Sequence, residues 1–494
     1  MGRWAQYVPA VIAAVGGAMY GIDTGIIATT IGHDSFNFYM FPPSGENSTL
    51  TGAIVSVYNA GQAAGTFAAG WAADRLSRKY AMTLACSIAV IGIILQVAAV
   101  NIGMFIAGRL LTGWSSGMIL PVVPIYIAEV SKPSQRGVVV GFQGMGIAIG
   151  FCAANWIGYG GVFAVGNLQW RIPLAMQFPC AVFLLVGSVL IPFSPRWLVS
   201  RDRLEEARAV LARIHLDAGE EFVDQEMIQI REQIVLERTY GSQDFLSGLL
   251  RLFGKQYIKR VSLSCFVLTL TQFAGVGVIQ NFQSIFYASV GFTGRRALLI
   301  SGIYGFMGLF GQLISLTVVA DRWRRTTTLW VGCLVLAVML SICMALSAEF
   351  ADGSNEAASR ATIAFIFMYS AAYAIFFNST TWVVASELLP LFIRSIGLAF
   401  ATFCNGVAAI VVSQITPVAM ENISWRYYAV FIAANLLGVV VYVFFLPETK
   451  GKTLEEIGEL FGDTLATAHI GDIDVVGKQG AMMLEDVGSK KESG

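Results

Sequence analysis

The segment GWAADRLSRK, residues 70–79, has a counterpart in VADRWRR, residues 319–325. In each segment an arginine follows an aspartate by four residues. The two pairs are Asp74 with Arg78 and Asp321 with Arg325. Because the same acid-to-base spacing recurs within one chain, we predict that the chain consists of two related halves.

Two further pairs of motifs appear in the same order in both halves. Glu129 precedes Arg136 by seven residues, and Glu387 precedes Arg394 by seven residues. The segment PFSPRWL begins at residue 192, and PETKGK begins at residue 447. Three matched pairs are difficult to attribute to chance, and they indicate an internal repeat that covers most of the chain.

The composition places both halves in a membrane. Of the 494 residues, 56% are apolar and 13% are charged, whereas soluble domains carry about a quarter charged residues. A helix needs roughly 20 apolar residues to cross a bilayer core about 30 Å thick. Twelve such runs predict spanning helices at 7–31, 50–72, 80–100, 103–128, 136–160, 172–192, 260–290, 295–320, 326–348, 361–386, 392–417 and 427–446.

A polar stretch divides these spans into six and six. We therefore predict an all-α integral membrane protein whose two six-helix bundles are related by a pseudo-two-fold axis, with a substrate site near the midplane where the bundles meet. The predicted divisions are an N-terminal bundle at 1–192, a cytoplasmic linker at 193–259, a C-terminal bundle at 260–446 and a cytoplasmic tail at 447–494. Helical periodicity in the linker, as in DRLEEARAVLARIH from Asp202, predicts short amphipathic helices there.

Basic residues predict the orientation of the chain, since positive charge resists translocation. With both termini in the cytoplasm, the cytoplasmic segments hold 26 of the 32 lysines and arginines. Asn47 and Asn422 then belong to glycosylation sequons on external loops. Asn378 also begins a sequon, but it lies inside a predicted span, so we interpret that match as chance.

The motifs together resemble the sugar porter family of the major facilitator superfamily, and its fungal members most. The matching segments are YGIDTG (20–25), GWAADRLSRK (70–79), GRLLTGW (108–114), PIYIAEVSKPSQRG (124–137), SPRWL (194–198), WVVASELLPLFIR (382–394) and PETKGKTLEEI (447–457). The resemblance implies the major facilitator superfamily fold and import of a monosaccharide, or a related small polyol or sugar acid, by proton symport through alternating access. We expect a plasma-membrane protein that functions as a monomer, with the lipid bilayer and a small sugar-like substrate as its partners.

Two charges inside the spans are informative, because a bare ion in a membrane costs several kcal/mol. Asp23 and Arg109 lie at similar depths, about 9 to 14 Å from the external ends of the first and fourth spans. We predict that they pair, and the resemblance places the family's proton-linked aspartate and arginine at these positions. Uniporters of the family carry Asn where this chain has Asp23. The alternative is a permanent structural ion pair.

Charges at the cytoplasmic ends resemble the family's inner gate, a network of ion pairs that forms in one bundle arrangement and breaks in another. The alternative is that they only enforce the positive-inside topology. Phe193, Ser77 and Arg324 depart from the residues usual in relatives, which predicts a differently wired gate. The predicted gate residues are Asp74, Arg75, Arg78, Glu129, Arg136, Asp321, Arg322, Arg325, Glu387, Arg394 and Glu448.

The candidate substrate residues match the residues usual in the family only in part. Side-chain amides and an aromatic face suit sugar hydroxyls and rings, and the candidates are Tyr20, Gln143, Gln272, Asn281, Trp382 and Asn405. The amides usual in relatives are replaced by Thr271, Gly277, Gly144, Leu309 and Ala409. Interhelical hydrogen bonding is an equal alternative for each retained amide.

Other function classes are disfavoured by the sequence. We find no Walker loop, nucleophile elbow or metal-ligand spacing, so we expect neither an enzyme nor an ATP-driven pump, and no cofactor except protons as the coupling ion. Equal numbers of acidic and basic residues, 32 each, argue against a nucleic-acid partner. The alternatives that remain are a facilitative sugar uniporter, a non-transporting nutrient receptor of the same fold, and an exporter, against which PETKGKTLEEI argues.

Overall fold

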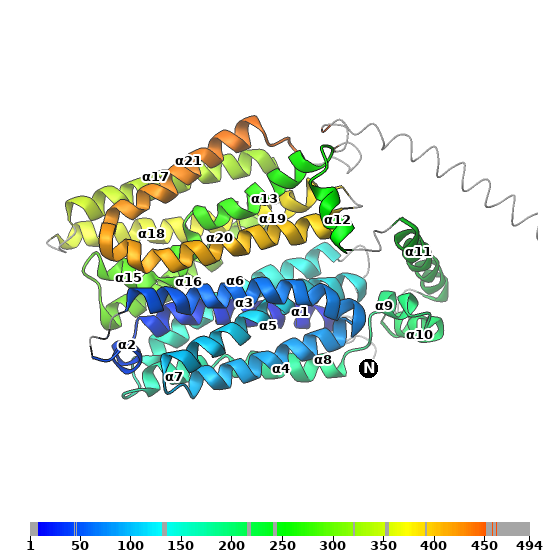
Figure 1. Cartoon of the computed structure of the whole chain (residues 1–494), viewed down its shortest axis with the longest axis horizontal. Helices are drawn as coiled ribbons and strands as arrows, with labels where there is room; N and C mark the ends of the chain where they lie inside the picture. Colours follow the sequence, from blue (N-terminus) through cyan, green and yellow to red (C-terminus); the bar gives the residue numbers. More distant parts are fainter. Residues whose placement is uncertain are drawn as a thin grey trace, which may run out of the picture.

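The computed structural model describes residues 8–450 except 44, 46, 131–135, 215–218, 241–244, 320–321, 351–354 and 391–392, and also residues 457 and 461. The regular elements of this described part are helices, and they form two bundles that lie side by side (Figure 1). Eight segments of the described part are long and apolar enough to cross a membrane, and one of them, Ile396–Phe444, has 49 residues and spans both α20 and α21. The helices α1, α3 and α6 contain 24, 28 and 26 residues, which exceeds the roughly 20 that a bilayer requires.

The first bundle is built from residues before 192. Its long helices are α1 (Val8–Ile31), α3 (Ser48–Arg75), α4 (Arg78–Val97), α5 (Ile102–Val130), α6 (Arg136–Gly161) and the pair α7 (Leu168–Ala175) and α8 (Phe178–Leu190). The short helix α2 (Asp34–Met40) joins α1 to α3. We call the end of the molecule that carries α2 the α2 end; the basic residues predict that it is external.

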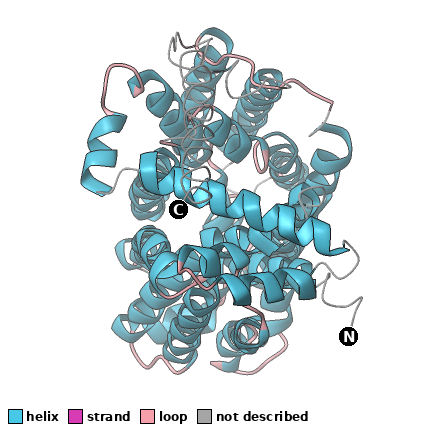
Figure 2. Cartoon of the chain, turned by 90° about the vertical axis from the view of Figure 1, so that its right-hand side faces the viewer, coloured by secondary structure: helices cyan, strands magenta, loops and turns pink. Residues whose placement is uncertain are grey.

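Four helices outside the bundles connect them at the opposite end, which we call the linker end. They are α9 (Pro195–Ser200), α10 (Leu204–Ile214), α11 (Gly219–Tyr240) and α12 (Phe245–Leu252). Figure 2 views the molecule from this end, with the spanning helices seen close to end-on. The amphipathic helix α10 buries Ala207, Leu211 and Ile214 on one face, as the sequence periodicity predicts.

Several helices of the second bundle are interrupted. The bundle contains α13 (Ile258–Phe273), α14 (Val276–Asn281), α15 (Gln283–Ala288), α16 (Gly294–Ile314) with a π-helical turn at Ser315–Val319, α17 (Arg325–Glu349), α18 (Glu356–Phe376), α19 (Thr380–Glu387), α20 (Arg394–Ile423), a 3-10 turn at Ser424–Tyr427 and α21 (Tyr428–Phe444). Gly275 separates α13 from α14 with a φ of +102°, a conformation that favours glycine. A second break, at 377–379, separates α18 from α19.

The bundles contact each other along α3 with α20, along α6 with α16, and between α1 and both α14 and α15. Toward the α2 end this interface is polar as well as apolar. The Ser56 hydroxyl donates to Gln414 Oε1 at 2.7 Å, and Asn59 Nδ2 donates to Ser413 Oγ at 3.0 Å. Ser48 also donates to Glu421 across the interface.

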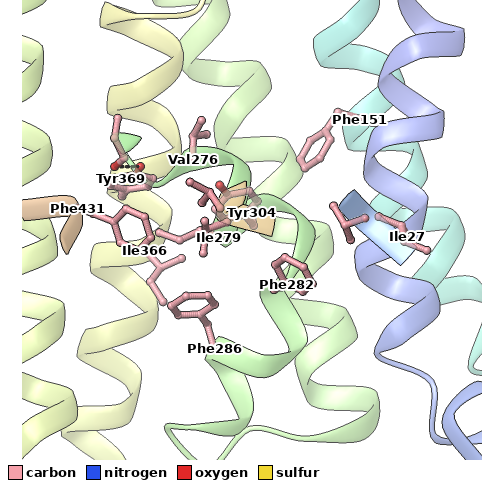
Figure 3. Close-up of a cluster of buried hydrophobic side chains, with 14 of the residues drawn as sticks. Ile27, Phe151, Val276, Ile279, Phe282, Phe286, Tyr304, Ile366, Tyr369 and Phe431 are labelled. Atoms are coloured by element: carbon pink, nitrogen blue, oxygen red, sulfur yellow. Dashed lines mark hydrogen bonds between the residues drawn. The ribbon is translucent and has the colours of Figure 1, made fainter. Parts of the chain in front are cut away.

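A buried apolar cluster reinforces the same contact. In Figure 3, Ile27 and Phe151 of the first bundle face Phe282 and Tyr304 of the second. The Phe151 and Tyr304 ring centroids lie 6.3 Å apart. Hydrogen bonds and apolar packing thus join the two bundles toward the α2 end.

Candidate functional site

Asp23 and Arg109, the two charges predicted to pair, do contact each other inside the first bundle. Asp23 lies on α1 and Arg109 on α5, and both side chains are buried. Arg109 Nη1 lies 3.6 Å from Asp23 Oδ1 and donates a hydrogen bond to the Asp23 main-chain carbonyl at 3.3 Å. Asp23 lies within one uninterrupted helix, because α1 runs from Val8 to Ile31.

Neighbouring side chains hold the pair in place. The Ser116 hydroxyl donates to Asp23 Oδ2 at 2.7 Å. The guanidinium carbon of Arg109 lies 4.1 Å from the centroid of the Tyr58 ring, a cation–π distance. Within the described part of the chain, Asp23 Oδ1 and Arg109 Nη2 have no hydrogen-bond partner. The hydrogen-bonding capacity of the ion pair is therefore not fully used.

The predicted substrate residues fall into two groups. Tyr20, Gln272, Asn281, Trp382 and Asn405 are all partly exposed, whereas Gln143 is buried. Gln143 Nε2 donates to the Leu120 carbonyl at 3.2 Å, which joins α6 to α5 within the first bundle. This contact favours the interhelical alternative for Gln143.

The partly exposed substrate candidates make few strong hydrogen bonds. Tyr20 OH accepts from Gln62 Nε2 at 3.3 Å, and Asn405 Oδ1 accepts from Thr271 Oγ1 at 3.5 Å. Asn281 Nδ2 donates to the Gly277 carbonyl of its own helix at 2.7 Å. These long or local bonds leave hydrogen-bonding capacity on the side chains.

Two of the unusual glycines have different surroundings. A Cβ atom built on Gly277 would lie 2.7 Å from Gln272 Oε1, so the Gln272 amide occupies the space that a side chain at 277 would take. A Cβ atom built on Gly144 would have one neighbour within 4 Å, Gln312 Nε2, at 4.0 Å. Gly144 therefore faces an amide that belongs to the other bundle.

A crevice between α3 and α20 is a weaker candidate for a substrate site. Its lining consists of Ala63, Thr66, Phe67, Ala399, Thr402 and Phe403. The lining contains two hydroxyls and no amide or charge. We do not assign substrate binding to it.

At the linker end, the predicted gate of the first bundle centres on Arg78. This side chain lies 3.2 Å from Asp74 Oδ1 and 3.0 Å from Glu129 Oε1. Ser194, the first residue of SPRWL, donates to Glu129 Oε2 at 2.5 Å. Glu129, at the end of α5, thus pairs with Arg78, the first residue of α4; the side chain of Arg136 lies outside the described residues. The Arg75 carbonyl accepts from Arg201 of the linker.

In the second bundle, the predicted gate centres on Glu448. It lies 3.5 Å from Arg324 and accepts hydrogen bonds from the main-chain N–H of Arg325 and from the Thr326 hydroxyl. Glu387 accepts from Thr449 at 2.6 Å, and Arg394 Nε donates to the Leu389 carbonyl at 3.3 Å. Arg322 is exposed, and Asp321 lies outside the described residues.

These contacts set the ionisation of Glu448. Partial burial raises the pKa of its carboxyl, but hydrogen bonds from the Thr326 hydroxyl and from the backbone N–H groups of Lys450, Arg325 and Thr326 outweigh burial. The pKa of Glu448 therefore lies below its usual range. The carboxylate form fastens the start of the tail to the N-terminus of α17, where the helix dipole also favours negative charge.

Phe193, which the family resemblance places at a usual glutamate, packs against aromatic side chains. Its ring stacks on Trp197 with centroids 5.4 Å apart, and Lys79 Nζ lies 5.2 Å from its centroid. Phe193 therefore links α9, through Trp197, to α4, through Lys79.

The comparisons with known proteins agree with this architecture. Residues 9–461 match the family model described as Sugar (and other) transporter. The chain belongs to this transporter family. It is 34% identical to the MFS-type transporter criB of Aspergillus cristatus, covering 92% of each chain. It is 28% identical to the sugar transporter STL1 of Saccharomyces cerevisiae, covering 93% of this chain and 82% of that one.

The solved structures show the fold. The inward-open xylose transporter XylE from E. coli superimposes with a TM-score of 0.76 at 22% identity, covering 91% of this chain and 98% of that chain. Another structure describes XylE as a proton:xylose symporter of the major facilitator superfamily. The predictions of a sugar porter, of the twelve-helix superfamily fold and of a transporter that is not an enzyme are confirmed.

Several residues around these sites were not predicted from the sequence. Ser116 and Tyr58 hold the ion pair, Ser194 holds Glu129, and Gln312 and Asn378 meet at the break between α18 and α19. Serines and tyrosines are common throughout the chain, so residue type alone could not single out these three. Two amides inside spans are rarer, and they were a usable signal for Gln312 and Asn378.

Proposed function

We propose that this transporter imports a monosaccharide, or a related small polyol or sugar acid, by proton symport through alternating access. The buried pair of Asp23 and Arg109 is the observation that carries the proposal. An ionisable pair inside a membrane-spanning bundle is costly, and its presence therefore indicates a function. The description of XylE as a proton:xylose symporter supports the same mechanism.

Coupling follows from the geometry of the pair. A carboxylate in an apolar interior favours its protonated form, whereas an adjacent guanidinium favours the ionised form. A bundle movement that lengthens the 3.6 Å contact between Arg109 and Asp23 would therefore favour proton uptake, and restoring the contact would favour release. Proton occupancy is thereby linked to conformation.

The energy available is sufficient for scavenging. One proton that moves through 100 mV supplies about 2.3 kcal/mol, or roughly fifty-fold accumulation of a neutral substrate. Each unit of pH difference adds about tenfold. A facilitator with the same fold would reach no accumulation at all.

The substrate class rests on uncharged groups. Tyr20, Gln272, Asn405 and Trp382 combine hydroxyl, amide and aromatic surfaces, which suit a polyhydroxylated compound. The names of relatives include sugar transporters and quinate permeases. Import of such a compound requires the plasma membrane, with both termini cytoplasmic as the basic residues predict, and one chain contains both bundles, so a monomer suffices.

Replacement of Asp23 tests the proposal. Cells that lack other sugar transporters would express wild type, Asp23→Asn or the control Asp34→Asn, whose carboxyl is exposed on α2. D-xylose, D-glucose, D-sorbitol and quinate would be added in turn to an unbuffered suspension. We expect alkalinisation and uphill uptake with wild type and the control, and neither with Asp23→Asn.

Accumulation of substrate by Asp23→Asn would contradict the proposal. If Asp23→Asn still accumulates substrate as wild type does, then the ion pair is structural. The coupling proton would then bind elsewhere in the protein.

A further inference from the structure

The helix α12 (Phe245–Leu252) lies at the linker end, between the linker and α13. In Figure 1 it runs across the direction of the spanning helices. The candidate span Ile258–Asn281 begins shortly after α12 ends. A helix that crosses the spanning direction beside the start of a span lies along the membrane surface.

One side of α12 packs on the second bundle. Leu252 is fully buried, and Leu249, three residues earlier, is partly buried in the same apolar cluster. This cluster includes Leu389 and Ile393, which lie between α19 and α20. The bundle therefore holds α12 in a defined position.

Other apolar side chains of this segment are uncovered. Leu250 is 65% exposed and Phe253 is 53% exposed. The Phe253 ring also contacts Phe400 of α20, with centroids 5.5 Å apart. Beyond Phe400, α20 exposes apolar side chains at a regular spacing of four residues, as expected for a face toward lipid; they are Phe403, Val407, Val411 and Ile415. The uncovered surface of α12 is thus continuous with a lipid-facing stripe.

Three exposed cations accompany these apolar side chains, namely Arg251, Lys255 and Lys259. Residues 245–260 include no aspartate or glutamate. Within the described residues, none of the three cations forms an ion pair. Lys255 and Lys259 flank Ile258, the first residue of the span, so their ammonium groups can reach the level of the lipid head groups.

The rest of the linker has a different charge pattern. Arg203 pairs with Glu206, and Arg208 pairs with Asp224. The helix α11 also begins with two glutamates. Uncompensated positive charge is therefore concentrated on α12 and the start of α13, beside the exposed apolar side chains. A positive-inside bias alone would not require this coincidence.

We propose that the exposed side of α12, together with the start of α13, binds the head groups of anionic phospholipids in the leaflet at the linker end. Leu250 and Phe253 contact the acyl region, whereas the three cations contact phosphate and carboxylate groups. Because Leu249 and Leu252 pack on the segment between α19 and α20, bound lipid also holds the linker against the second bundle. This surface is independent of the transported substrate and of the coupling proton.

Lipid-specific quenching tests the proposal on the full chain. Leu250→Cys would carry a bimane fluorophore, with identically treated wild type as the blank for its seven cysteines. The protein would be placed in phosphatidylcholine nanodiscs that contain an equal small fraction of doxyl-labelled phosphatidylcholine or doxyl-labelled phosphatidylserine. One cation near an anionic surface strengthens binding about fivefold. We therefore expect doxyl-phosphatidylserine to quench at least about fivefold more effectively.

Neutral variants separate this surface from net charge. In the Leu250→Cys protein, the preference for phosphatidylserine should disappear on combining Arg251→Gln, Lys255→Gln and Lys259→Gln. The matched control removes three exposed cations from the linker around α10 and α11 and should keep the full preference; its substitutions are Arg203→Gln, Arg213→Gln and Arg231→Gln.

Three results would overturn the lipid site. They are equal quenching by the two lipids, quenching by neither lipid, and a preference that survives the triple substitution on α12 and α13. Inorganic phosphate, added at constant ionic strength, should leave the preference for phosphatidylserine unchanged. Loss of the preference on that addition would assign the surface to free phosphate and would also overturn the proposal.

Discussion

Arg109 is a fully buried cation whose position depends on a single aromatic ring as much as on its ion pair. The guanidinium lies over Tyr58, and Arg109 Nε also reaches the Ile54 carbonyl at 3.5 Å. The sequence revealed the two charges because charges are rare in spans. The sequence did not predict Tyr58 and Ser116, because only the folded chain shows which of many similar residues contact Arg109 and Asp23.

Substitution of Tyr58 separates the ring from its hydroxyl. Tyr58→Ala should lower the free energy of unfolding by about 3 to 5 kcal/mol, because it leaves a cavity beside a buried guanidinium. Tyr58→Phe should cost no more than about 1.5 kcal/mol, since the ring stays in place and the hydroxyl contributes at most one hydrogen bond, to Asp23. Thermal unfolding of the purified protein would measure both, and equal losses would show that the hydroxyl matters more than the ring.

Glu448 makes stability depend on pH. Its pKa is held below the usual range, so its contribution is present above the pKa of the unfolded chain and is lost as pH falls through the lowered, folded pKa. Glu448→Gln should therefore reduce the Tm at neutral pH, and the difference from wild type should shrink on acidification. If the difference in Tm between Glu448→Gln and wild type stayed constant as pH fell, the ionisation of Glu448 would not be the cause of the pH dependence.

At the scale of helices, glycines decide how α3 and α5 pack. Cβ atoms built on Gly61 and Gly65 would lie 2.4 and 2.1 Å from backbone oxygens of α5, and those on Gly113 and Gly117 would lie 2.2 and 2.1 Å from backbone oxygens of α3. The two glycines of each helix are four residues apart, so each helix presents a face without side chains to the other helix. This contact positions Arg109, which lies one turn before Gly113.

A single methyl group tests this packing. Gly65→Ala should destabilise the protein by about 1 to 3 kcal/mol through overpacking against the Trp114 carbonyl. Gly70→Ala on the same helix meets nothing within 4 Å and should be neutral, or stabilising by up to about 1 kcal/mol. Fluorescence-detected gel filtration after heating would compare them, and equal behaviour would argue against the backbone contact.

Helix breaks show where prediction from sequence stops. Hydropathy located all twelve spans, but it read 260–290 and 361–386 as uninterrupted. Gly275 is one of 51 glycines, so its left-handed conformation had no distinctive signal. The break at 377–379 contains neither glycine nor proline, and its partner Gln312 lies 66 residues away from Asn378. Local propensity could not reveal a contact of that range.

For the whole molecule, the repeat in the sequence was the decisive clue. It predicted two bundles and the loops that carry Arg78, Glu129 and Glu448. It paired Glu129 with Arg136 by spacing; the fold brings Arg78 within 3.0 Å of Glu129, and the Arg136 side chain lies outside the described residues. Repeat spacing reports which loops correspond, but the tertiary arrangement determines which charges meet.

Hydrogen bonds between α3 and α20 should set the balance between closed and open arrangements of the α2 end. Removing both the Ser56 and the Asn59 bonds, at about 1 kcal/mol each, should raise the open population by about fivefold per bond. Spin labels at Val165→Cys and Arg296→Cys, exposed sites on the two bundles, would report the separation. The control Ser341→Ala removes a bond within α17 and should change nothing. An unchanged distance distribution in the double variant would contradict the assignment.

Proton coupling through Asp23 and Arg109 is the central claim, and proteoliposomes test it most directly. Purified protein would face an imposed potential of 100 mV, inside negative, with equal concentrations of substrate on both sides. Wild type should accumulate a neutral substrate toward about fifty-fold, the ratio that one proton supplies, and Asp23→Asn should remain at unity while still exchanging labelled substrate. Wild type that stays at unity, or Asp23→Asn that accumulates equally, would contradict the account.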